Sequence, residues 1–171
     1  MKKARKGFTL VELMIVVGIM GILGAMGIIA GQEATSAARA AVIADNLEKL
    51  STAAMMFYEE NSEEIDKTGT LDGTTAINAA ALAKGINAYL KTDNEVKSAA
   101  DTDNTYFAIV GTETGTALTW WVGYKFGTSD GNTQVQKAMK NKTNRMHLKT
   151  KVDATTDDYN GEATVYMKVR P

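Results

Sequence analysis

An uninterrupted apolar run at residues 8–31 constrains this chain more than any other feature. The run reads Phe-Thr-Leu-Val-Glu-Leu-Met-Ile-Val-Val-Gly-Ile-Met-Gly-Ile-Leu-Gly-Ala-Met-Gly-Ile-Ile-Ala-Gly, and Glu12 is its only ionisable side chain. At a rise of 1.5 Å per residue, a helix of this length extends about 36 Å and covers a bilayer hydrocarbon core of about 30 Å. We therefore expect residues 8–31 to form a membrane-spanning helix.

Charge is distributed unequally on the two sides of this run. Residues 1–7 carry four positive charges and no negative one, while the whole chain has 19 Lys and Arg against 20 Asp and Glu. The basic flank predicts that residues 1–7 lie in the cytoplasm and that everything after residue 31 lies outside. The remaining chain has a net charge of −5, which argues against nonspecific nucleic-acid binding. We expect no specific nucleic-acid partner.

Two ordinary explanations of this N-terminus are a secretory signal peptide and an uncleaved signal anchor. A signal peptide has an apolar core of about 7–15 residues and an Ala-x-Ala-like cleavage site, and Ile28-Ile29-Ala30 is a poor match to that site. A signal anchor fits the length and the flanks but does not explain Glu12. A carboxylate at the bilayer centre costs roughly 3 kcal/mol or more, so it normally marks a function.

The residues Lys6-Gly7-Phe8-Thr9-Leu10-Val11-Glu12, followed by the apolar helix, resemble the class III signal of type IV prepilins and type II secretion pseudopilins. The pattern of that family is a short basic leader ending in Gly, then Phe-Thr-Leu, then Glu four residues after the first mature residue. All of these features match. The resemblance covers roughly residues 1–60 and says little about residues 63–171.

The resemblance implies that a membrane aspartyl prepilin peptidase cuts after Gly7 and methylates the amino group of Phe8. It also implies that subunits wait in the membrane until an assembly platform and its ATPase extract them into a helical filament. Glu12 would then meet the Phe8 amine of a neighbouring subunit. In a dry filament core a charge partner offsets the desolvation of a carboxylate only in one register. We therefore interpret Glu12 as a register device and not as a catalytic base.

Two departures from the best-known pilus class leave the subtype open. Ile29 stands where such members often carry a helix-bending proline, and the chain has no cysteine for a C-terminal disulfide. Glycines could replace the missing proline, because each costs a helix about 1 kcal/mol relative to Ala. Two compatible hypotheses are close helix packing, with residues 27–31 as a GxxxG motif, and loss of helicity when the subunit leaves the bilayer. The glycines are Gly18, Gly21, Gly24, Gly27 and Gly31.

The helical pattern continues through residues 32–61 and becomes amphipathic. An apolar stripe follows the 4-3-4-3 spacing of one helical face, and polar residues occupy the opposite face. The stripe predicts the surface on which a head domain folds; a coiled-coil seam is the alternative, although hardly three heptads are available. The apolar residues are Ile43, Leu47, Leu50, Ala54 and Phe57, and the polar ones are Asp45, Glu48, Lys49, Thr52 and Glu59.

The remaining residues, 62–171, predict a globular head. We expect a loop at 62–76 (with Gly69 and Gly73), helices at 76–91 and 135–142, a turn-rich segment at 128–133, and strands at 106–112, 118–126, 145–152 and 163–170. The predicted fold class is α+β: a long N-terminal helical spine packed against a roughly four-stranded, mostly antiparallel sheet. The predicted organisation is a leader (1–7), a membrane and filament-core half (8–31), an amphipathic half (32–61) and the head (62–171).

Residues that carry chemistry are few. Zero cysteines exclude a thiol nucleophile and Cys-ligated metals, and the single histidine, His147, excludes a multi-His metal site. No Gly-x-Ser-x-Gly, Walker or dinucleotide-binding pattern is present. We expect His147 to point outward from the 145–152 strand. We expect no enzymatic activity, no cofactor and no metal.

Two acidic segments leave a weak calcium site open. Asp101-Thr-Asp103-Asn104 and Asp157-Asp158-Tyr-Asn160-Gly161-Glu162 supply oxygen ligands, but neither fits the twelve-residue calcium loop. Solvated turns are the default interpretation, and the resemblance to major pseudopilins, which often bind calcium near the C-terminus, keeps the alternative open. Trp120 and Trp121 fall on opposite faces of a strand; one is expected in the core, and the other at a subunit contact, exposed, or stacking on a ligand.

Charged residues are also segregated within the head. The interpretations are two solvated surfaces, a contact between oppositely charged patches of stacked subunits, or a local basic patch that binds DNA or an anionic surface. Five acids fall within eight residues, Glu59, Glu60, Glu63, Glu64 and Asp66, and six bases without an acid fall between Thr133 and Val152, namely Lys137, Lys140, Lys142, Arg145, Lys149 and Lys151.

Together with the resemblance, these features predict a structural subunit of a type IV pilus. The precursor would be a single-pass protein of the inner or cytoplasmic membrane, and the mature subunit would join other copies in an extracellular filament for adhesion, twitching motility or DNA uptake. The head length and the lack of a calcium loop favour a pilus over the alternative, a pseudopilin of a type II secretion system. A signal-anchored binding protein or enzyme is the rival from a different class.

Overall fold

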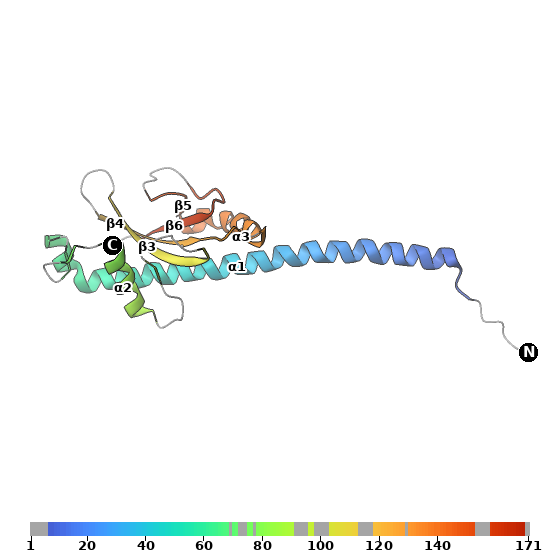
Figure 1. Cartoon of the computed structure of the whole chain (residues 1–171), viewed down its shortest axis with the longest axis horizontal. Coiled ribbons are helices and arrows are strands. Elements are labelled where there is room, and N and C mark those ends of the chain that lie inside the picture. The colour runs from blue at the N-terminus through green and yellow to red at the C-terminus, as the bar shows by residue number, and fades with distance from the viewer. Residues whose placement is uncertain are drawn as a thin grey trace, which may run out of the picture. The chain divides into compact units, whose positions relative to one another are not determined.

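The structure is a computed structural model that describes residues 7–68, 70–71, 75–76, 78–90, 96–97, 103–112, 118–128, 130–152 and 158–169. The expected leader, apart from Gly7, lies outside the described residues, as do Gly69, Gly73, Asp101 and Asp157. The chain divides into two compact units, residues 1–35 and residues 36–171. Figure 1 shows the helices and strands of both units.

Helix α1 (Leu10–Thr68) includes the helical part of the first unit and continues into the second. The helix extends seven residues beyond the expected end at Asn61, into the segment predicted as a loop. Residues 62–68 contain neither glycine nor proline, so the polar composition that suggested a loop is compatible with a solvated helix. After it, β1 (Thr70–Leu71) and β2 (Thr75–Ala76) form a two-stranded antiparallel pair that the sequence analysis missed.

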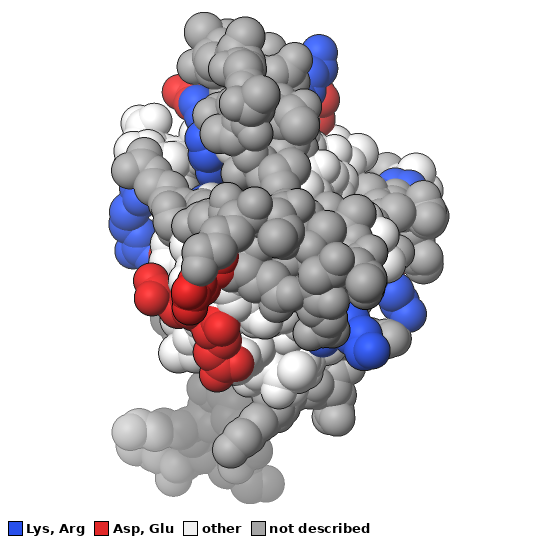
Figure 2. Space-filling model, turned by 90° about the vertical axis from the view of Figure 1, so that its left-hand side faces the viewer, with Lys and Arg blue, Asp and Glu red and all other residues white. Residues whose placement is uncertain are grey.

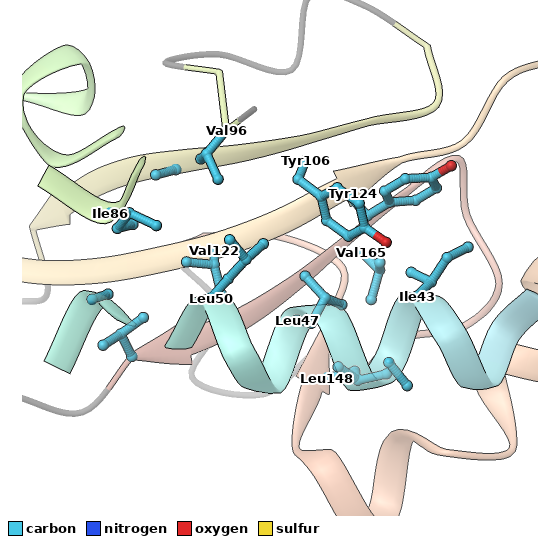
Figure 3. Close-up of a cluster of buried hydrophobic side chains, with 14 of the residues drawn as sticks. Ile43, Leu47, Leu50, Ile86, Val96, Tyr106, Val122, Tyr124, Leu148 and Val165 are labelled. Atoms are coloured by element: carbon cyan, nitrogen blue, oxygen red, sulfur yellow. The ribbon is translucent and has the colours of Figure 1, made fainter. Parts of the chain in front are cut away.

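The predicted apolar stripe of α1 is confirmed as the buried face of the second unit. Its five members are between 0% and 8% exposed, whereas the polar residues predicted opposite them are exposed. Burying a large apolar side chain of this kind contributes about 1.5–3 kcal/mol. Figure 3 shows Ile43, Leu47 and Leu50 of α1 pointing toward the side chains of the sheet.

The opposing layer is a four-stranded sheet in which every pairing is antiparallel. Its strands are β3 (Thr105–Thr112), β4 (Leu118–Lys125), β5 (Leu148–Lys149) and β6 (Thr164–Val169), in the order β3-β4-β6-β5. Alternate residues of β4, including Trp120, Val122 and Tyr124, join the core that contains the α1 stripe. The Trp120 ring lies 5.9 Å from Phe57 and 5.5 Å from Tyr58. The α+β fold class is therefore confirmed.

Helix α2 (Ala79–Tyr89) falls inside the range predicted for it. Asn78 caps the helix by accepting a hydrogen bond from the Ala81 N–H at 2.9 Å, and Leu82, Ala83 and Ile86 are buried. The Tyr89 hydroxyl donates a hydrogen bond to Glu60 of α1. Helix α2 therefore joins the core with its apolar residues and holds α1 with its last residue.

Both tryptophans of β4 are buried, which contradicts the expectation that the second one could be exposed. Trp121 is 1% exposed, and its Nε1–H donates to Thr119 Oγ1 at 3.1 Å. It shares its sheet face with Phe107, which is completely buried and meets Tyr166 edge-to-face at 5.5 Å. The chain therefore buries aromatic side chains on both faces of its sheet.

The segment between β4 and β6 differs most from the sequence analysis. Helix α3 (Asp130–Lys140) begins inside the segment predicted as a turn. The strand predicted over residues 145–152 is wrong: a short helix, α4 (Thr143–Met146), precedes β5, which has only two residues. His147 caps α4 in the left-handed conformation, with φ of 51°, and is exposed. The apparent alternation arose because Met146 and Leu148, both buried, belong to different elements.

We predict that Gly123→Ala destabilises the head. A Cβ atom at this position would lie 2.7 Å from the Val165 carbonyl oxygen and would also collide with the Phe107 ring. Because the backbone oxygen belongs to the neighbouring strand, the expected loss is about 1–3 kcal/mol of unfolding free energy. Urea unfolding of the full-length protein in detergent measures it, with exposed Thr128→Ala as the control. Equal stability of the two variants would contradict the prediction.

Because of Tyr159, we predict that the unfolding free energy of the head falls at alkaline pH. The side chain is 2% exposed, and its hydroxyl donates to the Glu162 carbonyl oxygen at 2.7 Å. Burial, assisted by the nearby Glu162 charge, raises the pKa of Tyr159 well above its usual value. A tyrosine in the unfolded chain ionises at about pH 10. As pH rises beyond that value, Tyr159 loses its proton in the unfolded state before it does so in the folded state, so the unfolding free energy falls.

Tyr159→Phe should therefore make stability less dependent on pH in the alkaline range. At neutral pH the variant should lose about 1 kcal/mol with the hydrogen bond. Above about pH 10 its unfolding free energy should fall less steeply than that of the parent, by up to about 1.4 kcal/mol per pH unit. Urea unfolding at several alkaline pH values measures both slopes. Identical slopes would show that Tyr159 does not retain its proton in the fold.

Candidate processing and assembly site

The predicted cleavage site lies directly before α1. Gly7, Phe8 and Thr9 have no regular secondary structure, and the helix begins at Leu10. The Phe8 side chain is 86% exposed, and a Cβ atom added at Gly7 would meet no described residue within 4 Å apart from its chain neighbours. Among the described residues, nothing therefore covers the bond between this small residue and the aromatic one, next to the helix start.

Thr9 and Glu12 form a reciprocal hydrogen-bonded cap at this start. Glu12 Oε2 accepts hydrogen bonds from both the Thr9 N–H and the Thr9 hydroxyl, each at 2.8 Å. In return the Glu12 N–H donates to Thr9 Oγ1 at 3.2 Å. The Thr9 carbonyl oxygen also accepts from the Leu13 N–H at 3.2 Å, so Thr9 is the N-cap residue of α1. This is the capping-box arrangement of Thr-x-x-Glu.

The capping box gives the Glu12 carboxylate two donors within its own chain. A carboxylate without donors is costly in a bilayer, and hydrogen bonds to its charged oxygen reduce that cost. The negative charge also lies at the positive end of the helix dipole. Thr9 is thus a site residue that the sequence analysis missed, although the Thr-x-x-Glu spacing was visible in the sequence.

The surface that follows Glu12 is apolar on every side. The large apolar side chains from Phe8 to Ile29 are between 46% and 86% exposed. Within the described residues, α1 is the one helix that is long and apolar enough to cross a membrane; its best window has a mean hydropathy of 2.6 and none of it is buried. Such a surface does not belong to the core helix of a soluble domain.

The five glycines of this segment all lie within α1. Apart from the helix's own backbone, no described residue lies within 4 Å of a Cβ atom added at any of them. Residues three apart fall about 60° short of a full helical turn. Glycines spaced by three therefore move around the helix and do not form a single straight face. Gly24, Gly27 and Gly31 share one side of the helix, whereas Gly18 points elsewhere. A close helix–helix contact would therefore use the last three glycines, and both glycine hypotheses remain predictions.

The acidic segments considered for calcium are engaged in other interactions where they are described. Asp103 pairs with Lys125 at 3.5 Å, and Asp158 pairs with Lys149 at 2.8 Å. Glu162 accepts a hydrogen bond from the Asn160 side chain at 3.1 Å. In the described part of the chain, no group of three or more His, Cys, Asp or Glu side chains could hold a metal ion.

Residues 2–28 match the prokaryotic N-terminal methylation motif. This motif is the substrate signal of prepilin peptidase, and together with the long apolar helix it fits the class III signal of a type IV pilin. Comparison with the curated proteins and with the solved structures found no match. The N-terminal segment is therefore similar to that of type IV pilins and pseudopilins, and the motif and apolar helix suggest a membrane anchor for the precursor.

We predict that Thr9→Ala loosens the start of α1 and that Thr9→Ser does not. Loss of an N-cap side chain costs about 1 kcal/mol, which corresponds to about fivefold faster opening of the first turn. Amide hydrogen exchange of residues 10–13, followed by NMR on the full-length protein in detergent micelles, measures this opening. Exchange rates that are equal in all three proteins would show that the capping box does not hold the helix start.

Proposed function

We propose that the protein is a type IV pilin, a structural subunit that assembles into a helical surface filament. The observation that carries the proposal is the combination at the N-terminus. The matched N-terminal methylation motif, residues 2–28, includes the capped start of α1, and the helix exposes apolar side chains on all sides within the first unit. Lipid covers such a surface in the precursor, and the same segments of neighbouring copies would cover it in a filament.

In this proposal Gly7 and Phe8 flank the bond that prepilin peptidase cuts, and the new Phe8 amine is methylated. Glu12 then pairs with the Phe8 amine of a neighbouring subunit and selects one register among many similar apolar contacts. Export from the membrane requires an assembly platform and its ATPase. The filament serves adhesion, twitching motility or DNA uptake.

The protein has no catalytic role in this proposal, and it needs no cofactor. Its buried polar atoms are used in structural hydrogen bonds: the Asn46 amide donates to the Tyr106 hydroxyl at 2.8 Å, and the Thr143 hydroxyl donates to the Tyr159 carbonyl oxygen at 3.3 Å. Within the described residues no buried side-chain N or O atom lacks a hydrogen-bond partner. These polar groups therefore maintain the fold.

A pseudopilin of a type II secretion system is the second candidate. The same motif and apolar helix would serve a short periplasmic fibre that does not reach the surface. The candidate rests on the N-terminal match, which both classes share. Recovery of surface filaments distinguishes the two functions.

The proposal predicts the mass of the mature subunit. Protein sheared from the cell surface should begin at Phe8, lack Met1–Gly7, and carry one methyl group on its amino terminus. Intact mass and the N-terminal peptide spectrum measure both changes. Gly7→Leu should abolish the cut by filling the position before the bond, and Gly18→Ala, which lies away from that bond, is the control.

Three outcomes separate the alternatives. N-methylated Phe8 in sheared filaments agrees with the pilin. A cut at Phe8 without surface filaments would favour the pseudopilin. An uncut chain that is confined to membranes would leave a signal-anchored protein and contradict the proposal.

A further inference from the structure

The exposed face of α1 within the head is strongly acidic. Five carboxylates and one base, Lys49, occur between Asp45 and Glu63, and Lys49 is paired with Asp45 at 2.6 Å. We call this face the acidic ridge; its acids, all on exposed residues, are Asp45, Glu48, Glu59, Glu60 and Glu63. Figure 2 shows acidic side chains gathered in a cluster at the end of the molecule that it faces.

An open groove runs beside this ridge. It has a volume of about 440 Å³ and lies between α1 and the last residues of α2. Ala53, Met56 and Leu90 give it an apolar lining. Asp45 and Glu48 supply carboxylates, and Lys49, which pairs with Asp45, also lines the groove. Tyr89, which also lines the groove, donates its hydroxyl proton to Glu60. An aliphatic stem that ends in a cation matches this combination, because the stem covers apolar atoms and the ammonium meets carboxylates.

The same chain carries such side chains where α3 ends. We call Lys137, Lys140 and Lys142 the lysine corner; the first two are one helical turn apart on α3, and the third follows in the next turn of chain. Lys137 and Lys140 are exposed, and none of the three forms an ion pair with a described residue. In contrast, Arg145 of α4 pairs with Glu48 at 3.7 Å, and Lys149 pairs with Asp158.

The lysine corner and the part of the acidic ridge formed by Glu59, Glu60 and Glu63 lie at different ends of the head. Helix α3 is at the end away from the last turns of α1 (Figure 1). Between Glu48, where α4 touches the ridge, and Glu60, α1 rises about 18 Å. Complementary surfaces at different places on one molecule form a heterologous, head-to-tail contact, which builds an open helical assembly when the rotation does not close a ring.

We propose that the acidic ridge and its groove bind the lysine corner of a second copy of this chain. The proposal rests on the proposed filament function and adds to it the contact between heads. Lysine stems lie on the apolar groove lining, and the ridge carboxylates accept from the ammonium groups. Since charge complementarity selects partners and register more than it adds affinity, this contact would set which heads are neighbours.

Charge exchange between the two surfaces tests the proposal. Lys137→Glu with Lys140→Glu places like charges together and should reduce sheared surface filaments on the order of tenfold, equivalent to about 1.4 kcal/mol per contact. Glu59→Lys with Glu63→Lys should cause a similar loss. The protein that carries all four changes should recover most of the filament yield. Lys84→Glu, an exposed charge reversal on α2, is the control and should assemble normally.

A cross-link locates the contact independently. Because the chain has no cysteine, Lys140→Cys with Glu59→Cys introduces the only two thiols. A short bismaleimide applied to filaments should produce a ladder of linked subunits, since each head-to-tail contact joins the two positions of different copies. Lys84→Cys with Glu59→Cys is the control and should give no ladder.

Normal filament yield from the lysine double variant would overturn the inference. A loss that the acid reversals do not rescue would also overturn it. A loss confined to the acid variants would assign the groove to a different partner. If the parent and Lys84→Glu proteins both fail to form filaments, the proposed function itself fails, and this outcome is distinct from a failure of the head contact alone.

Discussion

Helix α1 must satisfy two different environments with one continuous stretch of chain, and the rest of the structure depends on how it does so. In the first unit the apolar side chains surround the helix and are more than 45% exposed. In the second unit they contract to one stripe, which the sheet and α2 cover. The change is a change in pattern and not in helix propensity, because the helix continues from Leu10 to Thr68. Lipid or other helices are needed to cover the apolar side chains of the first unit, whereas the head itself covers the stripe in the second unit.

The polar groups follow the same division. Near its start, α1 satisfies its one carboxylate locally through Thr9, where water would be scarce in a membrane. In the head its carboxylates are numerous and exposed, and their ion pairs contribute little to stability. Stability of the head therefore comes from packing on both faces of the sheet.

Much of this fold was predictable from the sequence because hydrophobic periodicity carries the information. The stripe from Ile43 to Phe57, the alternation in β4 and the class α+β were all confirmed. The end of α1 was missed because charged residues are equally compatible with a loop and with a solvated helix. The strand predicted over residues 145–152 was wrong. Buried Met146 ends α4 and buried Leu148 begins β5, and the exposed, left-handed His147 between them produces the same alternation as a strand.

The residues of the candidate site could be proposed from the sequence, but their geometry could not. Gly7, Phe8 and Glu12 are recognisable by their order in the chain, whereas the contact that engages Glu12 comes from Thr9, a residue that looks unremarkable between two apolar ones. The assembly roles of Glu12 and of the five glycines belong to contacts between copies, which a single chain does not display. Burial of Trp121 was also invisible, since the sheet face on which it lies has no helix predicted over it.

If the protein assembles as proposed, the capping box has a consequence for the timing of assembly. Only Phe8 separates the proposed cut from the N-cap residue, so the new amine would stand beside the positive end of the α1 dipole. Its own Glu12 already accepts two hydrogen bonds from Thr9. An intact Gly7–Phe8 peptide bond withholds this cation altogether, and the cut releases it next to a like-signed helix end. The leader would then delay assembly. Until it is removed, the chain lacks the Phe8 ammonium group that would attract the Glu12 carboxylate of a neighbouring subunit.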